Sequence, residues 1–257
     1  MSYRLDRIIK LAGDGYDFSS TQFNLPKSLS KLIYNYGKKL IPDEDVFDSS
    51  DPQFGREKKG HITVKYGLHT NNPDDVKEVV SGFWSVVVSL GNISYFDNKD
   101  FDVVIIEVES DKLEKLNEKI SSEMKVTDTH PGYTPHITIA YVEKGKGSEY
   151  KGDDFFKGKK VKFHSLVFSA KDGRKFKIGL EGGKEVEEEV ELEEEKNKES
   201  AVYRDNLGFE EMYKFYEKAD SDEIAILENL LNSGLDDRLV WLKYRKLVNQ
   251  VLGVDLK

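Results

Sequence analysis

Two short segments of the chain carry the residue types that acid–base chemistry requires, and both have the same pattern. The hexamer HITVKY at 61–66 recurs as HITIAY at 136–141. Because the chain contains only five histidines, two matched hexamers that each begin with histidine are hard to attribute to chance. Both hexamers lie in runs of β-branched and aromatic residues, which predicts a β-strand for each.

Strand geometry determines which side chains of each hexamer act together. In a β-strand, residues i and i+2 point to the same face and lie about 6–7 Å apart along the backbone. His61 and Thr63 are therefore expected on one face of their strand, and His136 and Thr138 on one face of theirs. If the two strands face one cleft, two imidazoles and two hydroxyls surround a common point.

This set of groups suits the cleavage of a phosphodiester. A neutral imidazole can accept a proton from the attacking hydroxyl or water, and a protonated imidazole can donate one to the leaving oxygen. An unperturbed imidazole, with a pKa of about 6.5, can hold either state near neutral pH. The hydroxyls of Thr63 and Thr138 can donate hydrogen bonds to the non-bridging phosphoryl oxygens as charge develops there. The chemistry requires no metal ion, so we expect neither a metal nor a cofactor.

A metal site is the competing interpretation of the histidines. His61 and His69 are eight residues apart, which on one extended strand is about 26 Å and too far for one ion. The chain has no cysteine and no HExxH motif. Zinc is therefore not expected, and we predict surface or structural roles for His69, His130 and His164.

The net charge of −9 is unevenly distributed along the chain. Residues 181–200 contain ten Glu and three Lys, which leaves a net charge of only −2 for the rest. A basic segment spans 157–162. Because local charge attracts a ligand more than total charge does, the acidic composition does not argue against a phosphate-bearing substrate. The basic residues around the first hexamer are Arg56, Lys58, Lys59 and Lys65.

The Glu-rich segment also divides the chain. We predict a first domain over 1–182, an acidic linker over 183–202 and a helical module over 203–257. The N-terminal residues lack the apolar run of a signal peptide, and no stretch approaches the roughly 18–20 apolar residues of a membrane span. We therefore expect a soluble, cytoplasmic protein that does not enter a membrane, and the lack of cysteine fits a reducing compartment.

The first domain mixes helices and strands without the pattern of a doubly wound sheet, which predicts an α+β fold. Helices are expected at about 28–40, 73–84 and 111–124, the last with Asp111 as its N-cap. Strands are expected at about 20–24, 61–68, 85–96, 101–110, 136–142, 161–169 and 174–180.

Beyond the linker the pattern is helical. Three helices are expected at about 205–219, 221–233 and 236–252. A module of about 55 residues buries little core, so we expect it to dock on another surface or to self-associate. The predicted N-caps and turn residue are Asp205, Ser221, Asp236 and Gly234. The predicted core or interface residues are Leu227, Leu230, Leu231, Leu239, Leu242, Leu247 and Val251, with Trp241 and Tyr244.

The paired motifs resemble those of the 2H phosphoesterase superfamily, which carries His-x-Thr/Ser-x motifs in two pseudo-symmetric lobes. The resemblance covers about residues 15–180. Within this range the segments YDFSSTQFNLP, HITVKYGLH and HPGYTPHITIAYV together resemble phage-encoded anti-CBASS phosphodiesterases, which destroy the cyclic di- and trinucleotide signals of bacterial antiviral defence. The resemblance implies a bilobal fold with a central cleft and no metal. It also implies catalytic roles for His61, Thr63, His136 and Thr138.

The same resemblance implies how a substrate is held. An aromatic residue near the N-terminus would stack on a base, and Tyr16 is the first candidate for this role, with Phe18 second. The polar strand SSTQ would line the cleft, where Gln22 is the residue expected to bind substrate. The linker and the C-terminal helices lie outside the pattern of this family.

Three functions remain open at this point. The first is metal-independent hydrolysis of cyclic di- and trinucleotides by a viral protein in the bacterial cytoplasm, without binding to double-stranded nucleic acid. The second is cleavage of 2′,3′-cyclic phosphate ends of RNA, for which a broad basic face is expected, whereas this chain is acidic with local basic patches. The third is a nucleotide-binding or virion-associated module in which residues 203–257 bind a protein partner.

Overall fold

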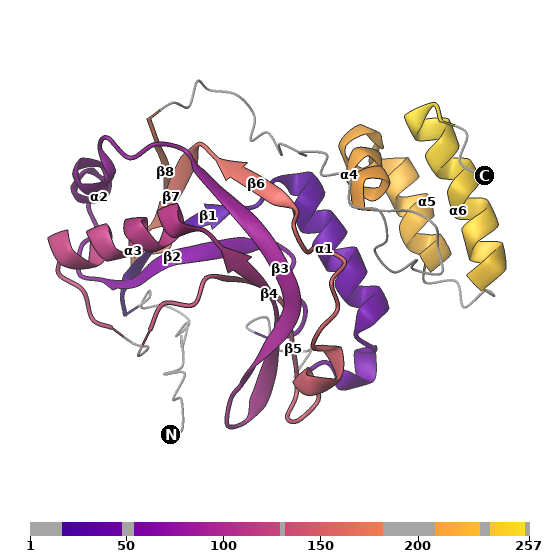
Figure 1. Cartoon of the computed structure of the whole chain (residues 1–257), viewed down its shortest axis with the longest axis horizontal. Helices are drawn as coiled ribbons and strands as arrows, with labels where there is room; N and C mark the ends of the chain where they lie inside the picture. Colours follow the sequence, from indigo (N-terminus) through magenta and orange to yellow (C-terminus); the bar gives the residue numbers. More distant parts are fainter. Residues whose placement is uncertain (1–16, 48–53, 129–131, 182–208, 232–236, 255–257) are drawn as a thin grey trace.

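The computed structural model describes residues 17–47, 54–128, 132–181, 209–231 and 237–254 of the chain (Figure 1). Its elements are β1 (Ser19–Asn24), α1 (Lys27–Leu40), η1 (Asp43–Asp45), β2 (His61–Leu68), α2 (Pro73–Val80), β3 (Val86–Asp97), β4 (Phe101–Glu109), α3 (Asp111–Glu123), β5 (His136–Glu143), η2 (Gly147–Tyr150), β6 (Lys160–Phe163), β7 (Ser165–Ser169), β8 (Lys175–Gly179), α4 (Phe209–Lys218), α5 (Ser221–Leu231) and α6 (Asp237–Leu252).

Two four-stranded sheets form the body of the molecule. Their strand orders are β2-β1-β7-β8 and β5-β4-β3-β6, and the paired strands are antiparallel in both. In Figure 1, α2 and α3 lie on one side of the strands and α1 lies on the other. This architecture confirms the predicted α+β class and its two lobes. Each His-x-Thr hexamer forms an edge strand, β2 in one sheet and β5 in the other.

An internal structural repeat relates the two edge strands. The units β1-α1-β2 and β4-α3-β5 each consist of a strand, a helix and a His-x-Thr strand that pairs with the first strand. Each helix packs against the His-x-Thr strand of the other unit, α1 against β5 and α3 against β2. At Gly37 of α1 an added Cβ would lie 2.6 Å from Ile139 Cγ2, so the absence of a side chain permits this close approach. The exchanged helices hold the two edge strands together.

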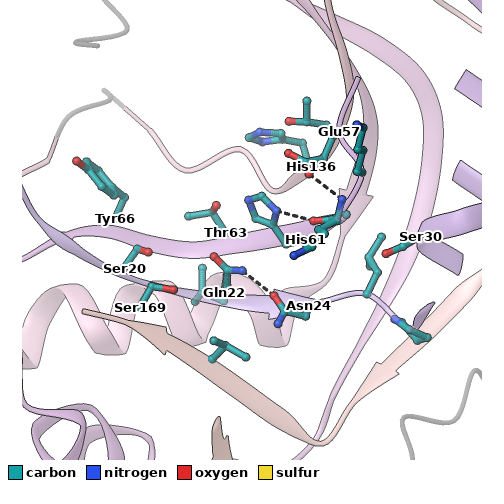
Figure 2. Close-up of a pocket in the computed structure, with 18 of the residues that line it drawn as sticks. Ser20, Gln22, Asn24, Ser30, Glu57, His61, Thr63, Tyr66, His136 and Ser169 are labelled. Carbon is teal, nitrogen blue, oxygen red and sulfur yellow. Dashed lines mark hydrogen bonds between the residues drawn. The ribbon is translucent and has the colours of Figure 1, made fainter. Parts of the chain in front are cut away.

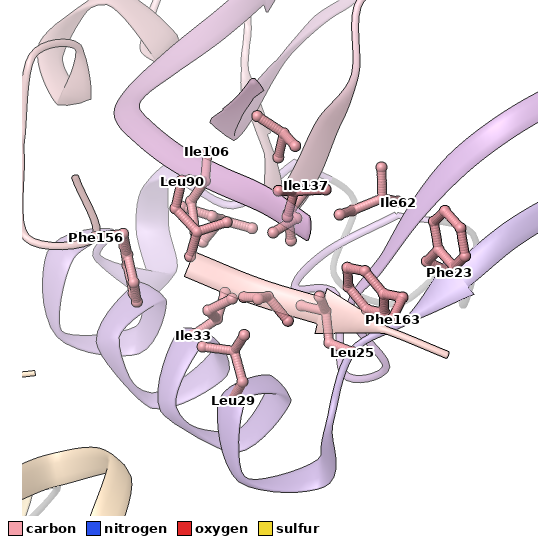
Figure 3. Close-up of a cluster of buried hydrophobic side chains, with 14 of the residues drawn as sticks. Phe23, Leu25, Leu29, Ile33, Ile62, Leu90, Ile106, Ile137, Phe156 and Phe163 are labelled. Atoms are coloured by element: carbon pink, nitrogen blue, oxygen red, sulfur yellow. The ribbon is translucent and has the colours of Figure 1, made fainter. Parts of the chain in front are cut away.

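The hydrophobic core fixes the orientation of both hexamers from behind. Ile62 and Ile137, the middle residues of the two His-x-Thr triplets, are fully buried in one hydrophobic cluster (Figure 3). The rings of Phe23 and Phe163 stack in the same cluster with centroids 4.8 Å apart. Full burial of such side chains contributes about 1.5–3 kcal/mol each. Because side chains alternate along a strand, burying the isoleucines turns the neighbouring histidines and threonines away from the core.

The predicted strand 161–169 is two strands. It breaks at His164, with β6 in the sheet that contains β5 and β7 in the sheet that contains β2. Each strand buries alternate apolar residues, Val161 and Phe163 in β6 and Leu166 and Phe168 in β7, so the alternation shifts by one residue where the chain changes sheet. His164 is therefore the crossover between the two lobes, which agrees with the structural role predicted for it.

Two helices differ from their predicted ends for local reasons. The helix expected at 73–84 ends at Val80, and Gly82 follows with a φ of 77°, a left-handed conformation that ends a helix. The N-cap of α3 is Ser110 rather than Asp111, because the Ser110 hydroxyl accepts a hydrogen bond from the Leu113 N–H at 3.3 Å.

The C-terminal helices dock on the first domain through α4. Tyr213, Phe215 and Tyr216 of α4 are buried, and α4 packs on α1. The N-cap of α5 is Asp220 rather than Ser221, because the Asp220 carboxylate accepts hydrogen bonds from the N–H groups of Asp222 and Glu223, both at 2.9 Å. Among the described helices, none is both long and apolar enough to span a membrane.

The described part of this module contains some of its predicted core. Leu227 and Leu247 are buried, and Val251 is partly buried. The division of the chain at 182/183 and 202/203 stays a prediction. The predicted N-caps and turn residue Asp205, Asp236 and Gly234 lie outside the described residues, as do the side chains of Leu230, Leu231, Leu239, Leu242, Trp241 and Tyr244.

Candidate active site

One large groove contains residues of both hexamers. It has a volume of about 2460 Å³ and opens between the edge strands β2 and β5. Figure 2 shows His61 and His136 close together in this groove, with Thr63 beside His61. The structure thus brings five of the six predicted site residues into one groove: Gln22, His61, Thr63, His136 and Thr138.

The two imidazoles make the same backbone contact. His61 Nδ1 lies 3.2 Å from the carbonyl oxygen of Lys59, and His136 Nδ1 lies 2.7 Å from the carbonyl oxygen of Thr134. In each case the partner is two residues upstream. A carbonyl oxygen can only accept a hydrogen bond, so both Nδ1 atoms carry their hydrogen. In the neutral imidazole, the Nε2 atom of each ring then carries the lone pair.

The surroundings of the two imidazoles differ. The ring of Phe96 on β3 lies edge-on to His136, with centroids 4.8 Å apart and an interplanar angle of 88°. His61 instead follows the exposed Lys58 and Lys59, which line the same groove. The two histidines therefore share one backbone contact but differ in their neighbours.

Both hexamers contain a β-bulge directly after the threonine. Val64 has no partner in the pairing of β2 with β1, and Ile139 has none in the pairing of β5 with β4. A bulge adds one residue to a strand and therefore reverses the alternation of side chains beyond it. As a result Tyr66 and Tyr141, five residues after the histidines, line the groove as well.

Strand alternation did not predict these two tyrosines at the site. Strict alternation places a residue at an odd offset on the opposite face from the histidine, so Tyr66 and Tyr141 were not expected beside it. The signal available in the sequence was the repeat itself, since both hexamers end in tyrosine.

Each bulged carbonyl is bound by a group outside the sheet. The Val64 oxygen accepts a hydrogen bond from Asn117 Nδ2 of α3 at 2.6 Å, and the Ile139 oxygen accepts one from the Glu57 N–H at 2.9 Å. A buried carbonyl without a partner costs about 1–3 kcal/mol. These two bonds therefore stabilise the bulges that place the tyrosines in the groove.

Aromatic neighbours and burial set the state of the two tyrosines. The ring of Tyr66 meets Phe18 edge-on with centroids 5.9 Å apart, and Tyr141 meets Phe54 and Phe101 edge-on, both at 5.5 Å. Burial raises the pKa of both hydroxyls, with the nearby carboxylates Asp17 and Glu57 adding to the effect. Both hydroxyls thus stay protonated at neutral pH and can donate hydrogen bonds to a ligand.

We expect replacement of Tyr66 by leucine to raise KM about 5- to 50-fold, because a stacked base contributes about 1–3 kcal/mol. Tyr66→Phe keeps the ring and is expected to stay within about threefold of the parent protein. Steady-state kinetics on any cleaved phosphodiester measures both. A Tyr66→Leu enzyme with an unchanged KM would show that the ring does not contact substrate.

Strand β1 supplies a row of polar groups to the groove. Ser20, Gln22 and Asn24 alternate along β1 and pair across the sheet with Tyr66, Thr63 and His61. The Gln22 amide donates a hydrogen bond to Asn24 Oδ1 at 2.6 Å (Figure 2). The resemblance implied that the strand SSTQ lines the cleft, and Ser20 and Gln22 of this strand line the groove.

Lysines supply the positive charge of the groove. One of the predicted basic residues has another role, since Arg56 donates hydrogen bonds to the carbonyls of Gly37 and Ile41 and thereby anchors the end of α1. Lys65 pairs with Asp128 at 2.5 Å. The lysines that line the groove are Lys27, Lys31, Lys58, Lys59, Lys65, Lys175 and Lys177.

The remaining aromatic and histidine predictions have different outcomes. Tyr16 and His130 lie outside the described residues, whereas Phe18 lines the groove. His69 is exposed, and its Nε2 lies 2.7 Å from Thr127 Oγ1. In the described ranges of the chain, no group of three or more His, Asp and Glu side chains could hold a metal ion.

Part of the chain matches the model of a known family. The family model of the 2′-5′ RNA ligase superfamily matches residues 47–158. The matched range contains both His-x-Thr strands and ends before β6. The match, with two antiparallel sheets and a groove between their edge strands, gives the 2H phosphoesterase fold that the resemblance predicted. It also supports phosphoesterase chemistry.

Three solved structures are similar to the chain at low identity. TT0787 of Thermus thermophilus is 14% identical with a TM-score of 0.47, and the alignment covers 64% of this chain and 99% of that one. A structure described as a phosphoesterase is 15% identical with a TM-score of 0.41, covering 64% and 95%. LigT of E. coli, complexed with NADP+, is 13% identical with a TM-score of 0.43, also covering 64% and 95%. No curated protein matched the chain.

Proposed function

We propose that this protein is a phosphodiesterase in which His61 and His136 act as the acid–base pair. The observation that carries the proposal is the matched Nδ1–carbonyl contact of the two imidazoles within one groove. Each contact fixes the ring and leaves Nε2 as the proton-transferring atom. Two such rings in one groove supply a base and an acid for a single displacement at phosphorus.

The proposed reaction is an in-line displacement. The neutral imidazole takes the proton of the attacking hydroxyl or water as that oxygen forms a bond to phosphorus. The protonated imidazole gives its Nε2 proton to the leaving oxygen as the bond between that oxygen and phosphorus breaks. Thr63 and Thr138 donate hydrogen bonds to the non-bridging oxygens, where negative charge accumulates. The two histidines exchange protonation states in one turnover and are reset by solvent.

We propose cyclic di- and trinucleotides as the substrate. The motif resemblance to phage anti-CBASS phosphodiesterases supports this choice, as does a groove larger than the roughly 300–1,000 Å³ of a typical small-molecule pocket. A ribose 2′-hydroxyl beside a 3′,5′ linkage can act as the internal nucleophile and give a 2′,3′-cyclic phosphate first. In this proposal the protein removes a host alarm signal in the cytoplasm of an infected bacterium.

The groove has mixed charge, which favours a small substrate over a long RNA. Its lysines are interspersed with the carboxylates Glu57, Asp97, Glu118, Asp128, Glu217 and Asp220. RNA affinity depends mainly on phosphate contacts with a continuous basic surface. The 2′,3′-cyclic phosphate end of RNA is therefore the second candidate substrate, and a binding module without turnover is the third.

The test is incubation of the full-length protein with cyclic dinucleotides, cyclic trinucleotides and a short RNA that ends in a 2′,3′-cyclic phosphate. Each reaction is run with and without EDTA, and the products are separated by chromatography. We expect turnover of a cyclic oligonucleotide that EDTA does not reduce. Loss of activity in EDTA would refute the metal-independent mechanism. If only the RNA with the 2′,3′-cyclic phosphate end were cleaved, that RNA end would be the substrate instead of a cyclic oligonucleotide. If none of the three substrates were cleaved, only a binding function would remain.

A further inference from the structure

The groove does not end within the family-matched region. Its lining continues onto the C-terminal helices, which contribute Tyr213, Tyr216, Glu217, Ala219, Asp220, Ser221 and Ile224. The family match covers residues 47–158 and so does not include these helices. The match therefore gives no account of the wall that they form.

Buried polar contacts fix α4 on α1, at Ser28 near the start of the helix and at Asn35 further along it. Asn35 Nδ2 of α1 donates a hydrogen bond to the Tyr216 hydroxyl, and the side chains of Tyr213 and Ser28 are also hydrogen-bonded. Tyr213 and Tyr216 are 2% and 5% exposed, and Phe215 between them is fully buried. Buried polar pairs specify one packing geometry more strictly than apolar contact alone. Helix α4 therefore has a defined position beside the groove.

The order of residues along β1 and α1 places α4 at one end of the groove. Ser20 lies opposite Tyr66, and Asn24 lies opposite His61. Because a strand rises about 3.3 Å per residue, these two positions are roughly 13 Å apart. The chain then continues through Pro26 into α1, whose first turns line the groove and carry α4. A strand of nucleic acid that extends from the reacting phosphate past Asn24 would meet α4.

The groups that α4 offers there repel a polyanion. Glu217 on α4 is exposed and lines the same groove as the exposed Lys27 and Lys31 of α1, and its carboxylate accepts a hydrogen bond from the Tyr213 hydroxyl. A longer strand would bring a phosphate next to a carboxylate, and exposed like charges within a Debye length of about 8–10 Å repel each other.

We propose that α4 closes this end of the groove and makes Glu217 a determinant of substrate length, so that the site admits di- and trinucleotides and disfavours longer single strands. The inference rests on the proposed phosphodiesterase function for its choice of ligand class. It concerns binding, however, so it can be tested without turnover.

The experiment measures Kd by fluorescence polarisation for labelled oligouridylates of two, four and eight nucleotides. Full-length protein carrying His136→Ala keeps the ligands intact, and Glu217→Gln and Glu217→Lys are added to it. We expect Glu217→Lys to lower the Kd of the octanucleotide about three- to tenfold and to change the Kd of the dinucleotide by less than about twofold. Glu217→Gln should lower the Kd of the octanucleotide by a smaller factor than Glu217→Lys. The gain should disappear at high salt.

Glu78→Lys is the matched control, because Glu78 is exposed on α2, lies outside the groove and gives the same change in net charge. Equal effects of Glu78→Lys and Glu217→Lys, or an effect of Glu217→Lys that is the same for all three lengths, would overturn the inference. If the wild-type protein cleaved no cyclic oligonucleotide, the proposed function would be refuted, whereas the inference about Glu217 would not. The two failures are therefore distinguishable.

Discussion

Replacing His136 with alanine is expected to lower kcat/KM about 10²- to 10⁴-fold, and replacing His61 is expected to do the same. Each substitution removes one of the two proton-transferring groups while the buried Ile62 and Ile137 continue to hold the strands. Because the proposed acid and base act in one step, the double variant should lose little more than either single variant. Steady-state kinetics on the cleaved cyclic oligonucleotide measures all three.

His69→Ala provides the matched histidine control. His69 is exposed and lies outside the groove lining, so its removal is expected to change kcat/KM by less than about twofold. If His136→Ala retained normal turnover, the acid–base proposal would be wrong. If the single losses multiplied in the double variant, the two histidines would act independently rather than as one pair.

The same variants separate acid from base. Because the reaction requires one histidine to be neutral and the other to be protonated, kcat/KM of the parent protein should have a bell-shaped dependence on pH. The variant that lacks the base should lose the acidic limb, and the variant that lacks the acid should lose the basic limb. Retention of both limbs in both variants would assign the titration to other groups.

Much of the site could be predicted because it depends on local periodicity. His61, Thr63, His136 and Thr138 share a face as a direct result of strand alternation, and the buried isoleucine between each pair fixes that face. The repeat of one hexamer was enough to suggest that both faces meet. The edge position of β2 and β5 is a consequence of the fold and adds the open groove between them.

The remainder depends on contacts that no local pattern contains. Tyr66 enters the groove because Val64 is bulged, and the bulge is stabilised by Asn117 from a distant helix. At His164 the buried apolar positions shift by one residue, from Phe163 to Leu166, and only the strand pairing shows that the two halves belong to different sheets. The docking of α4 on α1 depends on Asn35 and Tyr216, which are 181 residues apart in the sequence.

The two threonines offer the second large effect. Among the described residues, neither the Thr63 nor the Thr138 hydroxyl is engaged in a hydrogen bond to another protein group, and both line the groove with the histidines. We expect Thr63→Val and Thr138→Val, which remove the hydroxyl and keep the shape, each to lower kcat about 10²- to 10³-fold with a nearly unchanged KM. The effect falls on kcat because the oxygens gain charge in the transition state.

Serine at either position is the conservative control, because it retains the hydroxyl. Thr63→Ser and Thr138→Ser should stay within about tenfold of the parent kcat. A loss as large in the serine variants as in the valine variants would mean that the methyl group and its packing, rather than the hydroxyl, are required.

Sulfur substitution of the substrate connects each threonine to one phosphoryl oxygen. If Thr63 donates to one non-bridging oxygen, replacing that oxygen with sulfur should slow the parent enzyme but add little to the defect of Thr63→Val, because the same hydrogen bond is lost in both cases. The opposite diastereomer should show this non-additivity with Thr138→Val. Fully additive losses in all four combinations would indicate that the threonines shape the groove without touching the phosphate, and would reduce the proposed site to its two histidines.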